Sequence, residues 1–255
     1  MSKLPKQYKF VDLSDYGRSI ARWIASSLRN TAVTPIHVTS WFIVSGLIAI
    51  ACILLNWNFA AAFFLILKSI LDAADGELSR IKNMPSYIGR YYDSIADIIL
   101  NFLFLFTFWT LGDGSIVWML LAFVGMQLQG TLYNYYYVIL RNSVNGDKTS
   151  RIFENITPKA MEGEDQRTVD VFYHVFNFLY IAFDKTIYYL DMKAISSGPF
   201  PKWFMTSLSI FGLGFQLLIM SVMLVLHLEE YIIPFFIFYS ILIFVFVGIR
   251  RFAMK

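Results

Sequence analysis

The stretch Leu71–Asp97, LDAADGELSRIKNMPSYIGRYYDSIAD, places four aspartates between two strongly apolar segments. Its polar residues follow the pattern D-x2-D-G-x3-R-x8-G-x3-D-x3-D, which comprises Asp72, Asp75, Gly76, Arg80, Gly89, Asp93 and Asp97. Residues three and four positions apart share one face of a helix. Because carboxylates inside membrane segments are costly, this spacing indicates a site for a metal or a reacting substrate.

The two helices that flank this turn are predicted to be antiparallel neighbours. The link at 82–87 is short and contains Pro85, so the two acidic strips can face each other at the same depth. Four like charges at that separation repel strongly in a low dielectric. Either some of the carboxylates are protonated, or divalent cations lie among them. Ligation by oxygen alone favours hard ions such as Mg²⁺, Mn²⁺ or Ca²⁺.

The composition is that of a polytopic, all-α membrane protein. Of the 255 residues 57% are hydrophobic, and the mean hydropathy is +0.57, which is more than a soluble domain of this size needs. The net charge of +3 gives no electrostatic support for a nucleic-acid partner. The single cysteine, Cys52, excludes a disulfide framework.

Six segments are long and apolar enough to cross a membrane as helices of about 20 residues. They are His37–Asn56, Asn58–Ile81, Ile88–Leu111, Ser115–Arg141, Lys202–Leu228 and Tyr231–Ile249. The remaining N-terminal part, 1–36, is predicted to be cytoplasmic and to carry an amphipathic interfacial helix over Tyr8–Asn30. Residues 37–255 form the predicted six-helix catalytic domain. Within it, 142–201 is a cytoplasmic or interfacial insertion whose helix at 171–190 is interfacial or re-entrant.

Basic residues predict the orientation of the chain. The links at Trp57, Gly112–Gly114 and Glu229–Glu230 contain no lysine or arginine, whereas the links on the other side contain many. The positive-inside rule therefore places both termini and the aspartates on the cytoplasmic side.

Four residues in or next to the acidic stretch each have two possible interpretations. Gly76 and Gly89 either leave room for a ligand or allow close helix packing. Arg80 either binds a phosphate or carboxylate, or anchors the helix at the cytoplasmic surface. Lys68, one turn from Asp72, is predicted to form an ion pair that lowers the net charge of the cluster, and substrate contact is the alternative.

The stretch resembles the signature of the CDP-alcohol phosphotransferases (CDP-alcohol phosphatidyltransferases), D-x2-D-G-x2-A-R-x8-G-x3-D-x3-D. Seven of its eight fixed positions match in register, and the one departure is Ser79, where the family usually has alanine. An upstream P-N-x-x-T element of the family is matched by Pro35 and Thr39, but Ile36 replaces its asparagine. Pro35 and Thr39 can equally be a helix-start residue and a cap or packing residue.

The resemblance implies a role for each matching residue. Asp72, Asp75 and Asp93 are expected to hold Mg²⁺ or Mn²⁺ on the CDP diphosphate. Asp97 is expected to be the catalytic general base for the acceptor hydroxyl, and is also counted among the metal ligands. The residues expected to bind the nucleotide are Gly76, Ser79, Arg80 and Gly89. The candidates for binding an anionic acceptor, each of which can equally be a positive-inside charge, are Lys82, Arg90, Arg141 and Arg151.

The activity implied by the resemblance is transfer of a substituted phosphate group from a CDP-alcohol donor to an alcohol acceptor, with release of CMP, in phospholipid biosynthesis. CDP-diacylglycerol is the favoured donor because that subgroup is common among short six-span chains. The alternative is transfer of a choline, ethanolamine or inositol type of phosphoalcohol from its CDP derivative to a lipid or polyol. The family is commonly homodimeric, and membrane lipid is a further expected partner. A cation transporter is the non-enzymatic alternative, but it predicts acidic residues at several membrane depths.

Overall fold

The computed structural model describes residues 4–144, 153, 154 and 156–254, and every regular element in these residues is a helix. The α-helices are α1 (Arg18–Leu28), α2 (Pro35–Leu54), α3 (Asn58–Lys82), α4 (Tyr87–Thr110), α5 (Ile116–Ser143), α6 (Gln166–Leu190), α7 (Lys202–Leu208), α8 (Leu213–Val225), α9 (Ile232–Tyr239) and α10 (Ile241–Ala253). The short 3₁₀ helices are η1 (Lys6–Tyr8), η2 (Leu13–Asp15), η3 (Met192–Ser196), η4 (Ser209–Phe211) and η5 (Glu229–Tyr231).

The apolar helices indicate an integral membrane protein. Four segments are long and apolar enough to cross a membrane: Pro35–Leu54, Tyr87–Thr110, Ile116–Ser143 and Glu229–Ala253. A fifth span would be the pair Lys202–Phe211 and Leu213–Val225, which is bent by 53°. Helix α3, with 25 residues, is long enough to cross a membrane, but it contains too many charged residues to count as an apolar candidate span. The described residues thus contain four or five apolar candidate spans, and the count of six stays a prediction.

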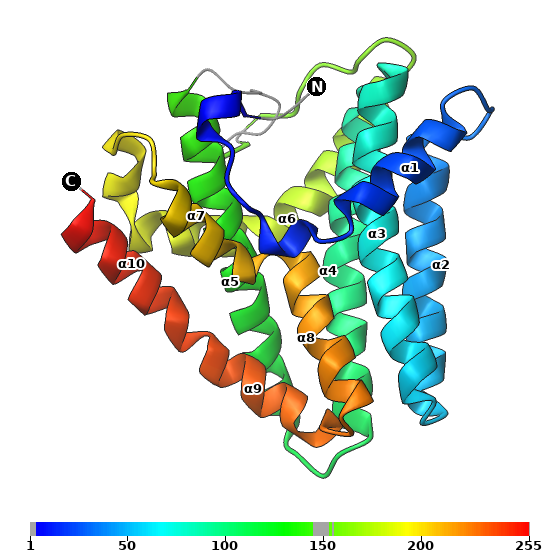
Figure 1. Cartoon of the computed structure of the whole chain (residues 1–255). Helices are drawn as coiled ribbons and strands as arrows, with labels where there is room; N and C mark the ends of the chain where they lie inside the picture. Colours follow the sequence, from blue (N-terminus) through cyan, green and yellow to red (C-terminus); the bar gives the residue numbers. More distant parts are fainter. Residues whose placement is uncertain (1–3, 145–152, 155, 255) are drawn as a thin grey trace.

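Helix α3 packs against α1, α2 and α8, while α4 packs against α2, α5 and α6 (Figure 1). Fully buried side chains such as Phe42, Leu65 and Phe104 fill the core between these helices. Gly46 brings α2 close to α4, because a Cβ atom there would lie only 2.9 Å from Cδ1 of Leu100. The buried side chains of Lys68 and Asp75 show that the charged face of α3 is directed into the bundle.

The N-terminal segment differs from the single helix predicted over Tyr8–Asn30. Helix α1 begins only at Arg18, and the residues before it run as a linker with short 3₁₀ turns. The Asp12 side chain accepts hydrogen bonds from Ser14 and from the hydroxyl of Tyr133 on α5, which holds the linker across the bundle. In Figure 1 this blue linker descends from beside α5 to the start of α8 before it turns into α1. These side-chain hydrogen bonds compete with helical backbone bonds, so the helix begins at Arg18 and not at Tyr8.

Helix α6 is the long helix within the predicted insertion. It packs against both α4 and α5, and the hydroxyl of Tyr180 donates to the Ser94 carbonyl of α4 at 2.7 Å. Asp165 caps its first turn by accepting from the Thr168 amide at 3.0 Å. Helix α6 thus forms one wall of the space beside the aspartates.

Candidate active site

A tight turn sets the two acidic helices against each other. Helix α3 ends at Asn83, which has the left-handed backbone conformation typical of a helix C-cap (φ 52°). Three residues later Ser86 caps α4, where its hydroxyl accepts from the Gly89 amide at 2.7 Å. Glu164 reinforces this start by accepting from the Ser86 hydroxyl at 2.7 Å and from the Ile88 amide at 2.9 Å. The turn thereby fixes the relative depth of the aspartates on both helices.

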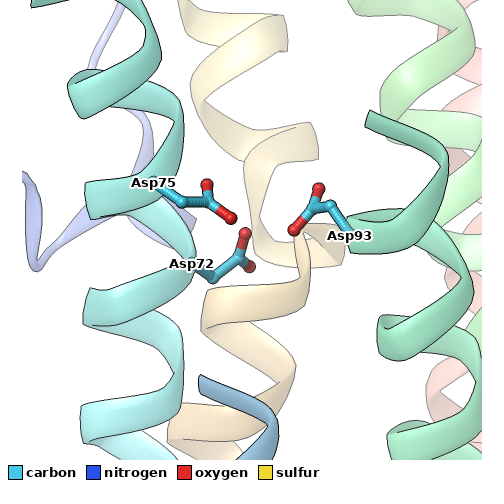
Figure 2. A group of neighbouring side chains, drawn as sticks. All are labelled: Asp72, Asp75 and Asp93. Atoms are coloured by element: carbon cyan, nitrogen blue, oxygen red, sulfur yellow. The ribbon is translucent and has the colours of Figure 1, made fainter. Parts of the chain in front are cut away.

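Three aspartates converge on one point between α3 and α4. Figure 2 shows Asp72 and Asp75 extending from α3 towards Asp93 on α4, and one carboxylate oxygen of each lies within 4.8 Å of the others. Asp75 is only 8% exposed, and its Oδ2 accepts a 2.6 Å hydrogen bond from the Thr39 hydroxyl of α2. Oδ1 of Asp93 is buried and has no hydrogen-bond partner in the described part of the chain. Three such close carboxylates are the arrangement that a hard divalent cation stabilises.

The fourth aspartate, Asp97, is bound by a lysine. Lys68 is fully buried, and its Nζ donates to Oδ1 of Asp97 and lies 3.6 Å from Oδ2 of Asp72. The same ammonium lies 4.5 Å from the ring centre of Phe42. Asp97 is not part of the group of three whose oxygens approach within 4.8 Å. The lysine therefore compensates the negative charge on the side of the cluster where Asp97 lies.

Gly76 and Arg80 lie together on α3, towards the end of that helix at Lys82. A Cβ atom on Gly76 would meet the Arg80 guanidinium at 3.6 Å, so the arginine covers this glycine. The guanidinium of Arg80 lies 3.3 Å from Oε1 of Glu77, which also accepts from Arg18 at 2.7 Å. Burial alone would lower the pKa of Arg18, but its bonds to Asp15 and Glu77 raise that pKa above the usual range.

Two predicted nucleotide-binding residues and one predicted acceptor residue contact other parts of the protein and not the pocket. The Ser79 hydroxyl donates to the Met84 carbonyl at 2.8 Å, where it closes the turn after α3. Lys82 donates to the carbonyls of Thr31 and Val33, both at 2.7 Å. A Cβ atom on Gly89 would lie 3.2 Å from the Ser86 hydroxyl, so glycine suits the capped start of α4. Ser79, Lys82 and Gly89 lie outside the pocket lining.

The other acceptor candidates are scattered. Arg90 lines the pocket, and its guanidinium contacts Oε2 of Glu154 at 2.6 Å. The same glutamate oxygen accepts from the Tyr91 hydroxyl at 2.7 Å. Arg141 is buried near the Tyr137 ring and is not among the pocket residues. Arg151 lies outside the described residues.

A pocket of about 510 Å³ encloses the site. All four aspartates line it, together with Gly76, Arg80 and Arg90. Its other walls come from elements outside the acidic signature: the linker before α1, the face of α5, helix α6 and the start of α8. The polar residues that they contribute include Asp12, Asp15, Gln127, Asn134, Asn177, Tyr180, Asp184 and Gln216. Asp184, an acidic residue within an aromatic helix, was the one visible signal that α6 approaches the site.

Residues 32–156, from just before α2 to the loop after α5, match the family model of the CDP-alcohol phosphatidyltransferases. No curated protein matches the chain significantly. The matched region contains every fixed residue of the acidic signature and both helices that carry it.

Residues 32–156 therefore form a domain of the CDP-alcohol phosphatidyltransferase family, as the acidic signature predicted. Members of this family transfer a phosphoalcohol group from a CDP-alcohol, so the protein is a transferase with a CDP-alcohol donor and an alcohol acceptor.

Proposed function

We propose that the protein uses a divalent cation to transfer a substituted phosphate group from its CDP-alcohol to the acceptor hydroxyl, with release of CMP. The observation that carries this proposal is the convergence of three carboxylate oxygens within 4.8 Å in a pocket that also contains Asp97. The geometry also accounts for the spacing of the signature, because each pair of aspartates lies on one helix face directed at the other pair.

The donor set suits a hard cation. Asp72, Asp75 and Asp93 offer oxygen ligands, and the buried Oδ1 of Asp93 has no other partner within the described residues. We propose that these three hold Mg²⁺ or Mn²⁺. Such an ion supplies Lewis-acid polarisation of the diphosphate and neutralises charge on the departing CMP.

The chain's own groups perform the proton transfer. Asp97 lies one helical turn from Asp93 on the same face of α4, and we assign it the proton of the acceptor hydroxyl. Lys68 holds this carboxylate through Oδ1 and so fixes its orientation. We assign the nucleotide phosphates to Arg80, whose guanidinium covers Gly76 and lines the pocket. The linker before α1, α5 and α6 contribute the other walls around the reacting groups.

The polar pocket bears on which substrate carries the lipid. Its lining outside the aspartates is rich in amides and hydroxyls, which suits a polar acceptor. We therefore propose that the acyl chains belong to the donor, which favours CDP-diacylglycerol and a role in phospholipid biosynthesis. The cytoplasmic orientation of the site and the homodimer stay predictions from the sequence and the family resemblance.

The direct test is CMP release by the purified protein in lipid nanodiscs with Mg²⁺ or Mn²⁺, for CDP-linked donors against a panel of acceptor alcohols. Asp97→Asn is expected to lower CMP release by about two to four orders of magnitude, because general-base help is lost. Mn²⁺ binding, followed by its electron paramagnetic resonance signal, is expected to persist in this variant. Asp113→Asn, in the exposed loop after α4, is the control. Full activity in Asp97→Asn would rule out the proposed base.

A second prediction concerns the hydroxyl that orients Asp75. Thr39→Val removes the 2.6 Å hydrogen bond to Oδ2 of Asp75 while it keeps the shape of the side chain. Partners of metal ligands are worth about 10- to 100-fold in affinity, so the Mn²⁺ dissociation constant should rise by about tenfold or more. Thr107→Val makes the same change on α4, where the hydroxyl donates only to the Leu103 carbonyl of its own helix. Equal Mn²⁺ affinities in the two variants would contradict the orienting role.

A further inference from the structure

The pocket has a deep end that the metal cluster does not use. Helix α4 runs from the turn after α3 to the loop 111–115, and α5 runs back from that loop. This loop lies at the end of α4 that is far from Asp93. Asn101 on α4 and Gln127 on α5 are the polar lining residues nearest to that loop on their helices. Asn101 lies one turn beyond Asp97 on the same helix face. The deep end therefore adjoins the proposed base.

Two buried amide atoms at this end lack hydrogen bonds. Asn101 is 5% exposed and Gln127 is 7% exposed, and both line the pocket. Oδ1 of Asn101 and Nε2 of Gln127 have no hydrogen-bond partner in the described part of the chain. An unpartnered polar atom of this burial is costly unless a ligand or water completes it. Hydroxyl groups of an alcohol suit both atoms, since a hydroxyl can donate to Oδ1 and can accept from Nε2.

A neighbouring glutamine shows what a satisfied amide looks like in the same helix. Gln129, two residues further along α5, is fully buried and donates to the Ser240 hydroxyl at 2.9 Å. Its Oε1 accepts from Gln216 at 2.9 Å. Gln129 thus links α5 to α8 and α9 and has a structural part, whereas Gln127 faces the pocket. A buried glutamine of α5 can thus be fully hydrogen-bonded within the protein, and the missing partner of Gln127 is specific to the pocket.

The charges along the pocket oppose an anionic acceptor. Its cationic lining residues, among those described, are Arg18, Arg80 and Arg90, which lie at the opposite end, near the turn. Each contacts a carboxylate: Arg18 contacts Asp15, Arg80 contacts Glu77 and Arg90 contacts Glu154. The lining also contains Asp184 and the four signature aspartates. Lys68 lies beside the deep end but is not a lining residue, and it is already paired with Asp97 and Asp72. A phosphorylated acceptor in the deep end would therefore meet carboxylates without a further cation to compensate its own charge.

We propose that the deep end binds the acceptor, and that the acceptor is an uncharged alcohol held by Asn101 and Gln127. This inference rests on the proposed function and names the substrate class of that site. The acceptor oxygen attacks the phosphorus that bears the donor alcohol, and the bond from this phosphorus to the CMP oxygen breaks. The hydroxyl proton passes to Asp97, CMP leaves with the electron pair, and a phosphodiester forms. A soluble polyol offers this hydroxyl when the donor carries the acyl chains, whereas a lipid alcohol as acceptor would support the deep-end site but contradict CDP-diacylglycerol as the donor.

The experiment compares acceptor classes in nanodiscs with the donor that gives CMP release. The acceptors are myo-inositol and glycerol as soluble polyols, diacylglycerol as a lipid alcohol, and glycerol 3-phosphate as the anionic competitor. One of the uncharged acceptors is expected to support faster CMP release than glycerol 3-phosphate, and its class identifies the source. Asn101→Leu and Gln127→Met, which keep side-chain volume, should each raise KM for that acceptor by about tenfold, the size of one hydrogen bond to a buried group.

Two readouts separate this role from a structural one. The uncharged acceptor should raise Tm of the wild-type protein but not of Asn101→Leu or Gln127→Met, while Tm without acceptor stays unchanged or rises because an unpartnered group is removed. Gln129→Met should do the reverse, lowering Tm and leaving the acceptor KM unchanged. Preference for glycerol 3-phosphate, or unchanged KM in both pocket variants, would overturn the inference but leave the transferase function standing. Absence of CMP release with every donor and acceptor would overturn the proposed function and this inference with it.

Discussion

Asp93→Asn is expected to abolish CMP release, with a loss of about a thousandfold or more, and to remove tight Mn²⁺ binding. Asp93 supplies the only carboxylate that α4 contributes to the group of three, and the other two lie on α3. Its Oδ1 is buried without another partner among the described residues, and an amide oxygen in its place lacks the negative charge that strengthens binding of a divalent cation. A metal contributes several kcal/mol to such a transition state, which corresponds to a loss of this size.

The comparison with Asp97→Asn makes this result specific. Both changes remove one negative charge from the same face of α4, yet only Asp93 belongs to the group of three. We therefore expect Asp93→Asn to lose activity and Mn²⁺ binding together, and Asp97→Asn to lose activity alone. Mn²⁺ bound with undiminished affinity in Asp93→Asn would refute the assignment of ligands. CMP release that survives in both variants would refute the mechanism as a whole.

The positions of the aspartates were predictable because helix periodicity and a short link leave little freedom. Spacings of three and four place Asp72 with Asp75, and Asp93 with Asp97, on single helix faces. Asn83 and Ser86 then end one helix and begin the next within a few residues. The ion pair of Lys68 was also predicted from its position one turn from Asp72, and the structure shows it.

The parts that were not predictable depend on contacts between segments distant in the sequence. The carbonyls that bind Lys82 belong to the loop before α2, so a pattern within one helix cannot reveal them. The linker before α1 is held by Tyr133, more than a hundred residues away. The contribution of α6 to the pocket depends on its packing against α4 and α5. The sequence predicted an interfacial or re-entrant helix at 171–190 but could not show which helices it would contact.

Lys68→Met is the second change with a large expected effect. Methionine keeps most of the apolar stem but leaves Asp97 and Asp72 without the ammonium that both contact. Removal of one partner from a buried ion pair typically costs about 3–5 kcal/mol, because the remaining charge is uncompensated. We expect Tm of the metal-free protein to fall by roughly 10 °C, and CMP release to fall as well because the proposed base loses its orienting contact.

The double variant Lys68→Met/Asp97→Asn separates the stability of the pair from its part in catalysis. Since the second change removes the uncompensated charge, Tm should recover most of the loss that Lys68→Met causes. CMP release should stay as low as in Asp97→Asn, because the general base is absent. A double variant no more stable than Lys68→Met would mean that the lysine acts chiefly through other contacts, such as the Phe42 ring. Recovery of stability without recovery of activity would instead show that Lys68 is retained to hold a carboxylate charge inside the bundle that the reaction requires.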